Sequence, residues 1–144
     1  METKITSVLR AEEQVADALP LYASRTAAGF GVPGDDSIDD SLNIHDFLVK
    51  NPSATFFVRV SGDSMEGAKI FDGDVLVVDR SQTPKQNSIV IAAVNGEMVV
   101  KRLQKRGDST FLVSENEDYQ PVELAESDDC FIWGVVVGSA RMIT

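Results

Sequence analysis

The sequence contains few of the residue types that build disulfides and metal sites. Cys130 is its one cysteine, so the chain cannot form an internal disulfide. His45 is its one histidine, and without a spaced set of cysteines and histidines there is no zinc-type site. We therefore expect neither a metal nor another cofactor. Cys130 is predicted to lie in the core and His45 on the surface of a helix.

Long apolar runs are also missing. No segment approaches the roughly 20 apolar residues that a membrane-spanning helix needs. The first residues lack the basic start and the continuous apolar stretch of a secretory signal. We therefore expect a cytoplasmic protein with no membrane partner. A chain of 144 residues with 43% hydrophobic content is long enough to bury one core.

Positive charge is scarce: 13 Lys and Arg stand against 23 Asp and Glu, for a net charge of −10. Binding to the phosphate backbone requires clustered basic side chains. The one cluster is Lys101, Arg102, Lys105 and Arg106. Direct, sequence-specific DNA binding is therefore not expected.

Two segments carry the residues of a candidate catalytic pair. Ser64 lies in the run SGDSM at residues 61–65, where Gly62 and Asp63 favour a tight turn with accessible backbone N–H groups. Lys101 lies in the β-prone run VVKRL at residues 99–103, on the same face as Val99 and Leu103. A serine hydroxyl needs an adjacent base, and a lysine can serve only when burial makes it neutral. The pair thus suggests a Ser-Lys dyad.

Other active sites fit less well. Gly67 stands one place too far from Ser64 for the nucleophile elbow of the α/β-hydrolases, and His45 alone gives weak support for a Ser-His-Asp triad. Lys69 is close to Ser64 in sequence, but it does not lie on an apolar strand. The acidic residues 115–118 do not match the spacing of a calcium loop.

The pattern along the chain is mostly β. Asn43 is a plausible N-cap, with Asp46 three residues later, for a short helix that ends before Pro52. Strands are predicted at about 56–60, 74–79, 88–94, 97–104, 110–114 and 130–137. We expect a compact, curved, antiparallel β-domain with one short helix. A weak helical stripe of Ile5, Val8, Val15 and Leu19 precedes it.

The order of these segments resembles that of a known family. A strand leads into Ser64 and Met65, an Asp-Gly-Asp turn follows at residues 72–74, and a later strand carries Lys101. This order is similar to that of the LexA/UmuD family of self-cleaving serine proteases. Residues 51–65 and 89–103 resemble its UmuD-like members most closely, and the resemblance runs from about residue 28 to near the C-terminus.

The resemblance implies a division of the chain and a set of roles. Residues 1–40 would be a flexible N-terminal arm, and residues 41–144 the protease domain. The bond between Ala28 and Gly29 stands where UmuD-like members have their scissile bond. Ser64 would be the nucleophile and Lys101 the general base. The backbone N–H groups of Ser64 and Met65 would form the oxyanion hole.

The family also implies a biological role. The chain would be a homodimeric accessory subunit of an error-prone translesion polymerase in the SOS response to DNA damage. A RecA filament on single-stranded DNA would promote self-cleavage, and the partner would be a UmuC-type Y-family polymerase. The alternative is a non-catalytic regulatory module that restrains the polymerase and RecA.

Overall fold

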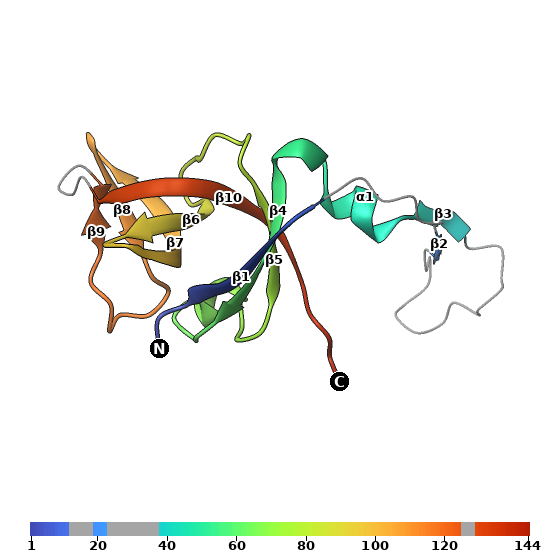
Figure 1. The fold of residues 1–144 in the computed structure, drawn as a ribbon, viewed down its shortest axis with the longest axis horizontal. Coiled ribbons are helices and arrows are strands. Elements are labelled where there is room, and N and C mark those ends of the chain that lie inside the picture. Colours follow the sequence, from blue (N-terminus) through green and yellow to red (C-terminus); the bar gives the residue numbers. More distant parts are fainter. Residues whose placement is uncertain (12–18, 23–37, 125–128) are drawn as a thin grey trace. The chain divides into compact units, whose positions relative to one another are not determined.

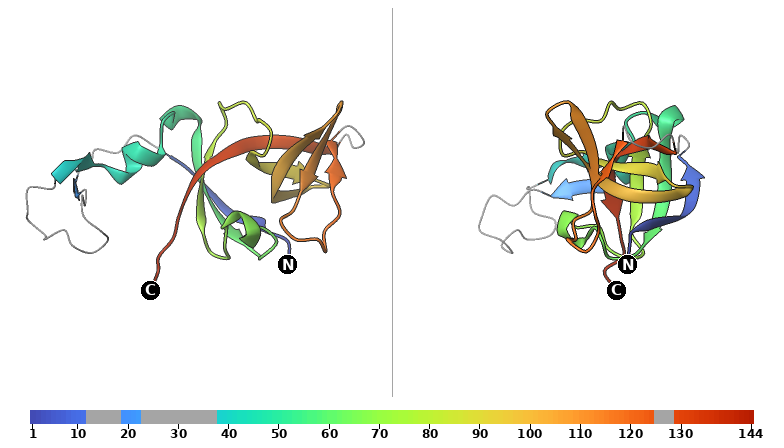
Figure 2. Two further views of the ribbon diagram at one scale, coloured as in Figure 1. Left: turned by 180° about the vertical axis from the view of Figure 1, so that it is seen from behind. Right: turned by 90° about the vertical axis from the view of Figure 1, so that its left-hand side faces the viewer.

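The computed structural model describes residues 1–11, 19–22, 38–124 and 129–144. The chain forms two compact units (Figures 1 and 2). The larger unit combines Met1–Glu12 with Asn51–Thr144, and the smaller consists of Glu13–Lys50. Residues from the start of the chain thus belong to the same unit as the predicted catalytic pair. The predicted boundary near residue 40 between arm and protease domain stays a prediction.

The smaller unit contains two short strands and a helix. β2 (Leu19–Tyr22) pairs antiparallel with β3 (Ile38–Leu42), and α1 spans Ile44–Leu48. The Asn43 side chain accepts a hydrogen bond of 3.2 Å from the Asp46 N–H at the start of α1. This contact satisfies one of the free N–H groups of the first turn, as the cap pattern predicts.

The larger unit is one antiparallel sheet of eight strands (Figure 1). Their order is β1-β4-β5-β10-β6-β7-β8-β9. The strands are β1 (Lys4–Arg10), β4 (Thr55–Ser61), β5 (Val75–Asp79), β6 (Ile89–Val94), β7 (Glu97–Arg106), β8 (Ser109–Val113), β9 (Val122–Glu123) and β10 (Cys130–Ala140). Short 3-10 turns, η1 (Pro52–Ala54) and η2 (Glu66–Ala68), flank β4. The predicted mostly β fold with one short helix is confirmed.

The sheet curls until β1, at one edge, reaches β7. Lys4 of β1 pairs with Ser61 of β4 and also with Val99 of β7, so β1 joins two strands that are far apart in the strand order. The inside of the curl is filled by β-branched and other apolar side chains in two clusters. The first includes Val58, Val60, Met65, Leu76, Ile91 and Val100, and the second Val90, Val99, Leu103 and Leu112. Cys130 packs half-buried against the second cluster, at the margin of the core.

The helical stripe predicted near the start of the chain is wrong for residues 4–10, which form β1. Within β1, Ile5 packs against the core, while Val8 is exposed. The backbone of β4 offers antiparallel partners from Phe56 to Ser61. Sheet pairing decides the conformation here because a helix shorter than about 12 residues gains little stability by itself.

Asp79 is a buried carboxylate at the end of β5. It accepts hydrogen bonds from the Ser81 N–H at 2.8 Å, the Ser81 hydroxyl at 2.6 Å and the Asn51 side-chain amide at 2.7 Å. Burial acts to raise the pKa of Asp79, but hydrogen bonds from Ser81 and Asn51 outweigh it and hold the pKa below its ordinary value of 3.8. The charged carboxylate therefore stabilises the fold.

We predict that Asp79→Asn lowers the free energy of unfolding at pH 7 by about 1–3 kcal/mol, because an amide has one acceptor oxygen and cannot accept from Ser81 and from Asn51 at the same time. Because the folded pKa is depressed, the stabilisation is present above about pH 4 and is lost as the pH falls further. Urea unfolding at pH 7 and at pH 3 measures both effects. Asp108→Asn, in an exposed turn, is the control. An unchanged midpoint in Asp79→Asn at pH 7 would contradict this account.

Candidate active site

Ser64 lies in the turn that follows β4. Gly62 has a φ of +108°, a conformation that favours glycine, and its N–H donates to the Asp72 carboxylate at 2.9 Å. Met65, fully buried in the first core cluster, anchors the other side of Ser64. The Ser64 carbonyl accepts from the Glu115 N–H at 3.0 Å. The turn is thus held from three directions.

Lys101 lies in the middle of β7, opposite Val90 of β6. Its side chain shares a buried face with Val99 and Leu103, as the alternation of the strand indicates, and the residue is 2% exposed. Nζ donates to the Ser114 hydroxyl at 2.7 Å and forms an ion pair of 2.6 Å with the Glu2 carboxylate. The Tyr119 ring centre lies 5.5 Å away. Lys101 is therefore a buried cation with a carboxylate partner.

Consecutive residues near the start of the chain bring the candidate pair into one site. Glu2 binds Lys101, and the next residue, Thr3, binds Ser64. The Thr3 N–H donates to Ser64 Oγ at 2.8 Å, and the Ser64 hydroxyl donates to Thr3 Oγ1 at 3.1 Å. Ser64 and Lys101 do not hydrogen-bond to each other here. The Ser64 proton therefore points to Thr3 rather than to a base.

The tight turn that the sequence favours does not expose Ser64, which is 0% exposed. The N-terminal residues approach the serine turn closely. A Cβ added to Gly62 would lie 2.3 Å from the Glu2 carbonyl oxygen, closer than atoms can approach. Thr3 is itself fully buried. The sequence pattern did not reveal this cover.

Two neighbouring N–H groups of the serine turn converge on one carbonyl oxygen. The N–H groups of Asp63 and Ser64 donate to the Met1 oxygen at 2.9 and 3.0 Å. Converging donors of this kind can stabilise the oxyanion of acyl transfer. The structure pairs the Ser64 N–H with that of Asp63, whereas Met65 contributes its carbonyl to η2 and Ile70.

The Asp63 side chain adds a charge contact beside these donors. Its carboxylate lies 2.5 Å from the Met1 ammonium, and both groups are exposed. The hydrogen bond that the ammonium donates to Asp63, followed by its hydrogen bond with Tyr119, raises the pKa of that ammonium from 8.0 to about 10. The same contact lowers the pKa of Asp63. Residues 1–3 thus contact the serine turn through both backbone and charge.

Sequence reasoning missed Ser114, Tyr119, Glu2 and Thr3 as parts of this site. The signal for Ser114 was present in the hairpin of β7 and β8: Arg102 pairs with Val113, so Lys101 faces the residue after Val113. Ser114 and Tyr119 line a cavity of about 460 Å³ that also involves residues 113–121. Nothing in the pattern of residues 1–3 pointed to the site.

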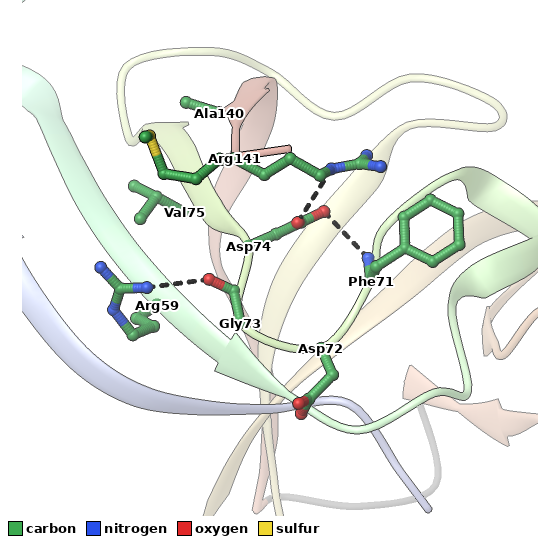
Figure 3. Close-up of a pocket in the computed structure, with 9 residues that line it drawn as sticks. Arg59, Phe71, Asp72, Gly73, Asp74, Val75, Ala140 and Arg141 are labelled. Atoms are coloured by element: carbon green, nitrogen blue, oxygen red, sulfur yellow. Dashed lines mark hydrogen bonds and ion pairs between the residues drawn. The ribbon is translucent and has the colours of Figure 1, made fainter. Parts of the chain in front are cut away.

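Figure 3 shows the Asp-Gly-Asp turn, residues 72–74, beside Arg59 and Arg141. Arg59 donates to the Gly73 carbonyl at 2.9 Å, and Arg141 pairs with Asp74 at 3.0 Å. These residues line a cavity of about 410 Å³ that contains neither Ser64 nor Lys101. The turn's contribution to the site is thus structural, through the contact from Asp72 to Gly62.

The remaining predictions concern a metal site, a membrane helix, His45 and the scissile bond. Among the residues described, no group of three or more His, Cys, Asp or Glu side chains could hold a metal. In the same part of the chain, no helix is long and apolar enough to cross a membrane. His45 lies within α1. The predicted scissile bond between Ala28 and Gly29 lies outside the described residues.

Comparisons with known proteins agree with the architecture. Residues 20–137 match the family described as Peptidase S24-like.

Protein MucA of Salmonella typhimurium is 46% identical over 124 residues, which cover 85% of this chain and 84% of MucA. Protein ImpA of Shigella flexneri is 46% identical over 87 residues, 60% of each chain. The LexA repressor of Shewanella piezotolerans is 35% identical over 130 residues, 90% of this chain and 62% of the repressor. The predicted LexA/UmuD-type relationship is confirmed, and the chain belongs to the Peptidase S24-like family.

Proposed function

We propose that this protein is a Ser-Lys serine endopeptidase that cleaves its own chain between Ala28 and Gly29. The observation that carries the proposal is the joint contact of Glu2 and Thr3 with Lys101 and Ser64. One extended stretch of backbone can therefore meet both reactive groups and, at the same time, the N–H groups of Asp63 and Ser64. A peptide bond held in that place would have a nucleophile, a base and an oxyanion site around it.

In the proposed mechanism, Lys101 reacts in its neutral form. It takes the proton of the Ser64 hydroxyl, and the resulting alkoxide attacks the carbonyl carbon of Ala28. The oxyanion accepts from the Ser64 N–H and from that of Asp63, which the geometry favours over Met65. Lys101 then donates its proton to the Gly29 amine as the peptide bond breaks. Water hydrolyses the ester between Ala28 and Ser64, which frees residues 29–144.

Ser114 would orient the base. Its hydroxyl accepts from Lys101 Nζ in the present arrangement and can do so whether the lysine is charged or neutral. Lys101 is buried, with Val99 and Leu103 on the same face of β7. In the proposed mechanism this position shields the base from water.

For the biological role, we propose that the chain acts in the SOS response to DNA damage as a homodimeric accessory subunit of a UmuC-type Y-family translesion polymerase. A RecA filament on single-stranded DNA would promote its self-cleavage in the cytoplasm. The similarity to MucA and ImpA supports this assignment. Binding to RecA and to the polymerase can be measured directly with purified proteins.

The electrostatics argue against direct, sequence-specific DNA binding by this chain. The net charge is −10. Within the basic cluster, Lys101 is buried and Arg102 forms an ion pair with Glu115. Arg106 lies over the Phe111 ring. Part of the cluster is therefore unavailable for phosphate contacts.

A second candidate function is the non-catalytic module that restrains the polymerase and RecA. One observation favours it: the arrangement of Ser64 and Lys101 in this structure is not reactive, since Lys101 forms an ion pair with Glu2 and the Ser64 hydroxyl hydrogen-bonds to Thr3. Cleavage of the purified protein with and without a RecA filament separates the two functions. A chain that stays intact under both conditions would support the module.

We predict that Ser64→Ala abolishes self-cleavage, because the variant has no nucleophile. Mass spectrometry after incubation with a RecA filament should find only the intact chain. Ser61→Ala, in the same segment, is the matched control and should still yield residues 29–144. A fragment that begins at Gly29 in Ser64→Ala would refute the nucleophile assignment.

We predict that the rate of spontaneous cleavage rises between neutral and alkaline pH, because the neutral fraction of a lysine base grows with pH. Lys101→Arg should be inactive at every pH, since arginine stays charged. Lys69→Arg tests the other nearby lysine and should keep the native profile. Gel densitometry of the intact and shortened chains gives the rates. A flat profile, or activity in Lys101→Arg, would exclude this role.

We predict that Gly29→Glu slows cleavage by roughly 10–100-fold, since forcing a bulky group into a close-fitting site costs about 1–3 kcal/mol. Gly34→Glu, in the same segment but away from the scissile bond, should cleave at the native rate. Mass spectrometry identifies the bond that is cut. Cleavage at a different bond in the native protein would refute the assignment of the scissile bond to Ala28 and Gly29.

A further inference from the structure

Residues 1–4 occupy the candidate site as an extended peptide. The Met1 carbonyl accepts from the Asp63 and Ser64 N–H groups, and the Thr3 carbonyl accepts from the Val100 N–H at 3.0 Å. Lys4 then pairs with Ser61 on one side and Val99 on the other. Backbone bonds of this kind to the edges of existing strands are how sheets bind extended peptides. The site therefore holds a peptide already, supplied by its own chain.

The side chains of this segment complement the reactive groups. Glu2 places a carboxylate 2.6 Å from Lys101 Nζ, which stabilises the ammonium form. An ammonium has no lone pair and cannot take a proton from Ser64. Thr3 engages the Ser64 hydroxyl as both donor and acceptor. Residues 2 and 3 thus disable the base and the nucleophile separately.

Occupation by residues 1–4 excludes any other segment. Ser64 is 0% exposed and Lys101 is 2% exposed while β1 is in place. The Glu2 backbone lies against Gly62 with no space for even one additional carbon atom. A second peptide therefore cannot reach Ser64 while residues 1–4 are in place.

We propose that residues 1–4 are a built-in competitive inhibitor, and that they must leave the site, with loss of the ion pair from Glu2 to Lys101, before the segment around Ala28 and Gly29 can dock. This inference rests on the proposed self-cleavage. It adds a resting state and names the contact that maintains it. An activating partner would then act by favouring the exchange of one segment for the other.

The first test is Glu2→Gln, which keeps the shape of the side chain and removes its charge. Spontaneous cleavage at neutral pH should become faster by about tenfold or more, since a hydrogen bond between charged groups is lost. Glu97→Gln is the matched control. Glu97 lies on β7, as Lys101 does, and its substitution removes an exposed ion pair with Lys4 of β1. Its rate should stay within about twofold of the native rate.

Hydrogen exchange of the intact chain reports docking independently of cleavage. The Val100 amide, which donates to Thr3, should be protected in the native protein and should exchange about tenfold faster in Glu2→Gln. An unprotected Val100 amide in the native protein would refute the docked state. Faster exchange without faster cleavage would refute inhibition. Equal acceleration by Glu97→Gln would refute the specific role of the pair between Glu2 and Lys101.

A reversible lock gives the converse test. Lys4→Cys with Ser61→Cys, in a Cys130→Ser background, places two thiols at paired positions of β1 and β4. The oxidised protein should not cleave, and the same protein after reduction should cleave again. Cleavage at equal rates in both forms would overturn the proposal. If no form cleaves even at alkaline pH, the proposed protease and its inhibition both fail, while protection of Val100 still reports the docking.

Discussion

The double pairing of β1 is the constraint on which the larger unit depends. Lys4 is the position at which β1 meets β4 and β7 together, so the curled sheet closes there. The residues that precede Lys4 therefore lie beside the candidate pair, with Thr3 in contact with Ser64 and Glu2 in contact with Lys101. Closure of the sheet and coverage of the candidate site are therefore one structural event. A change that releases residues 1–4 uncovers both reactive groups at once.

The buried lysine has two kinds of neighbour. Val99 and Leu103 share its face of β7 and belong to the second core cluster, whereas the Glu2 carboxylate lies 2.6 Å from Nζ. A buried charge that loses its partner is costly, so the ion pair links Lys101 to the segment that carries Glu2. The surroundings of Lys101 therefore depend on the segment that lies in the site.

The serine turn is also held by contacts outside residues 1–4. Asp72 accepts from Gly62, Met65 is buried in the core, and Glu115 donates to the Ser64 carbonyl. These contacts help to position the N–H groups of Asp63 and Ser64, which donate to the Met1 carbonyl in this structure. Preorganised donors of this kind need little rearrangement when charge develops during a reaction. The comparisons place this scaffold in the Peptidase S24-like family.

The sequence by itself determined the parts of this protein that depend on local pattern. β-prone runs placed the strands that became β4 to β8 and β10, and the cap at Asn43 placed α1. Period-two alternation put Lys101 on a buried face beside Val99 and Leu103. Only the tertiary structure decided what β1 does, because residues 4–10 take their conformation from strands about 50 and 95 residues away. The partners of Ser64 and Lys101 follow from that pairing, so no local pattern could reveal Glu2 and Thr3.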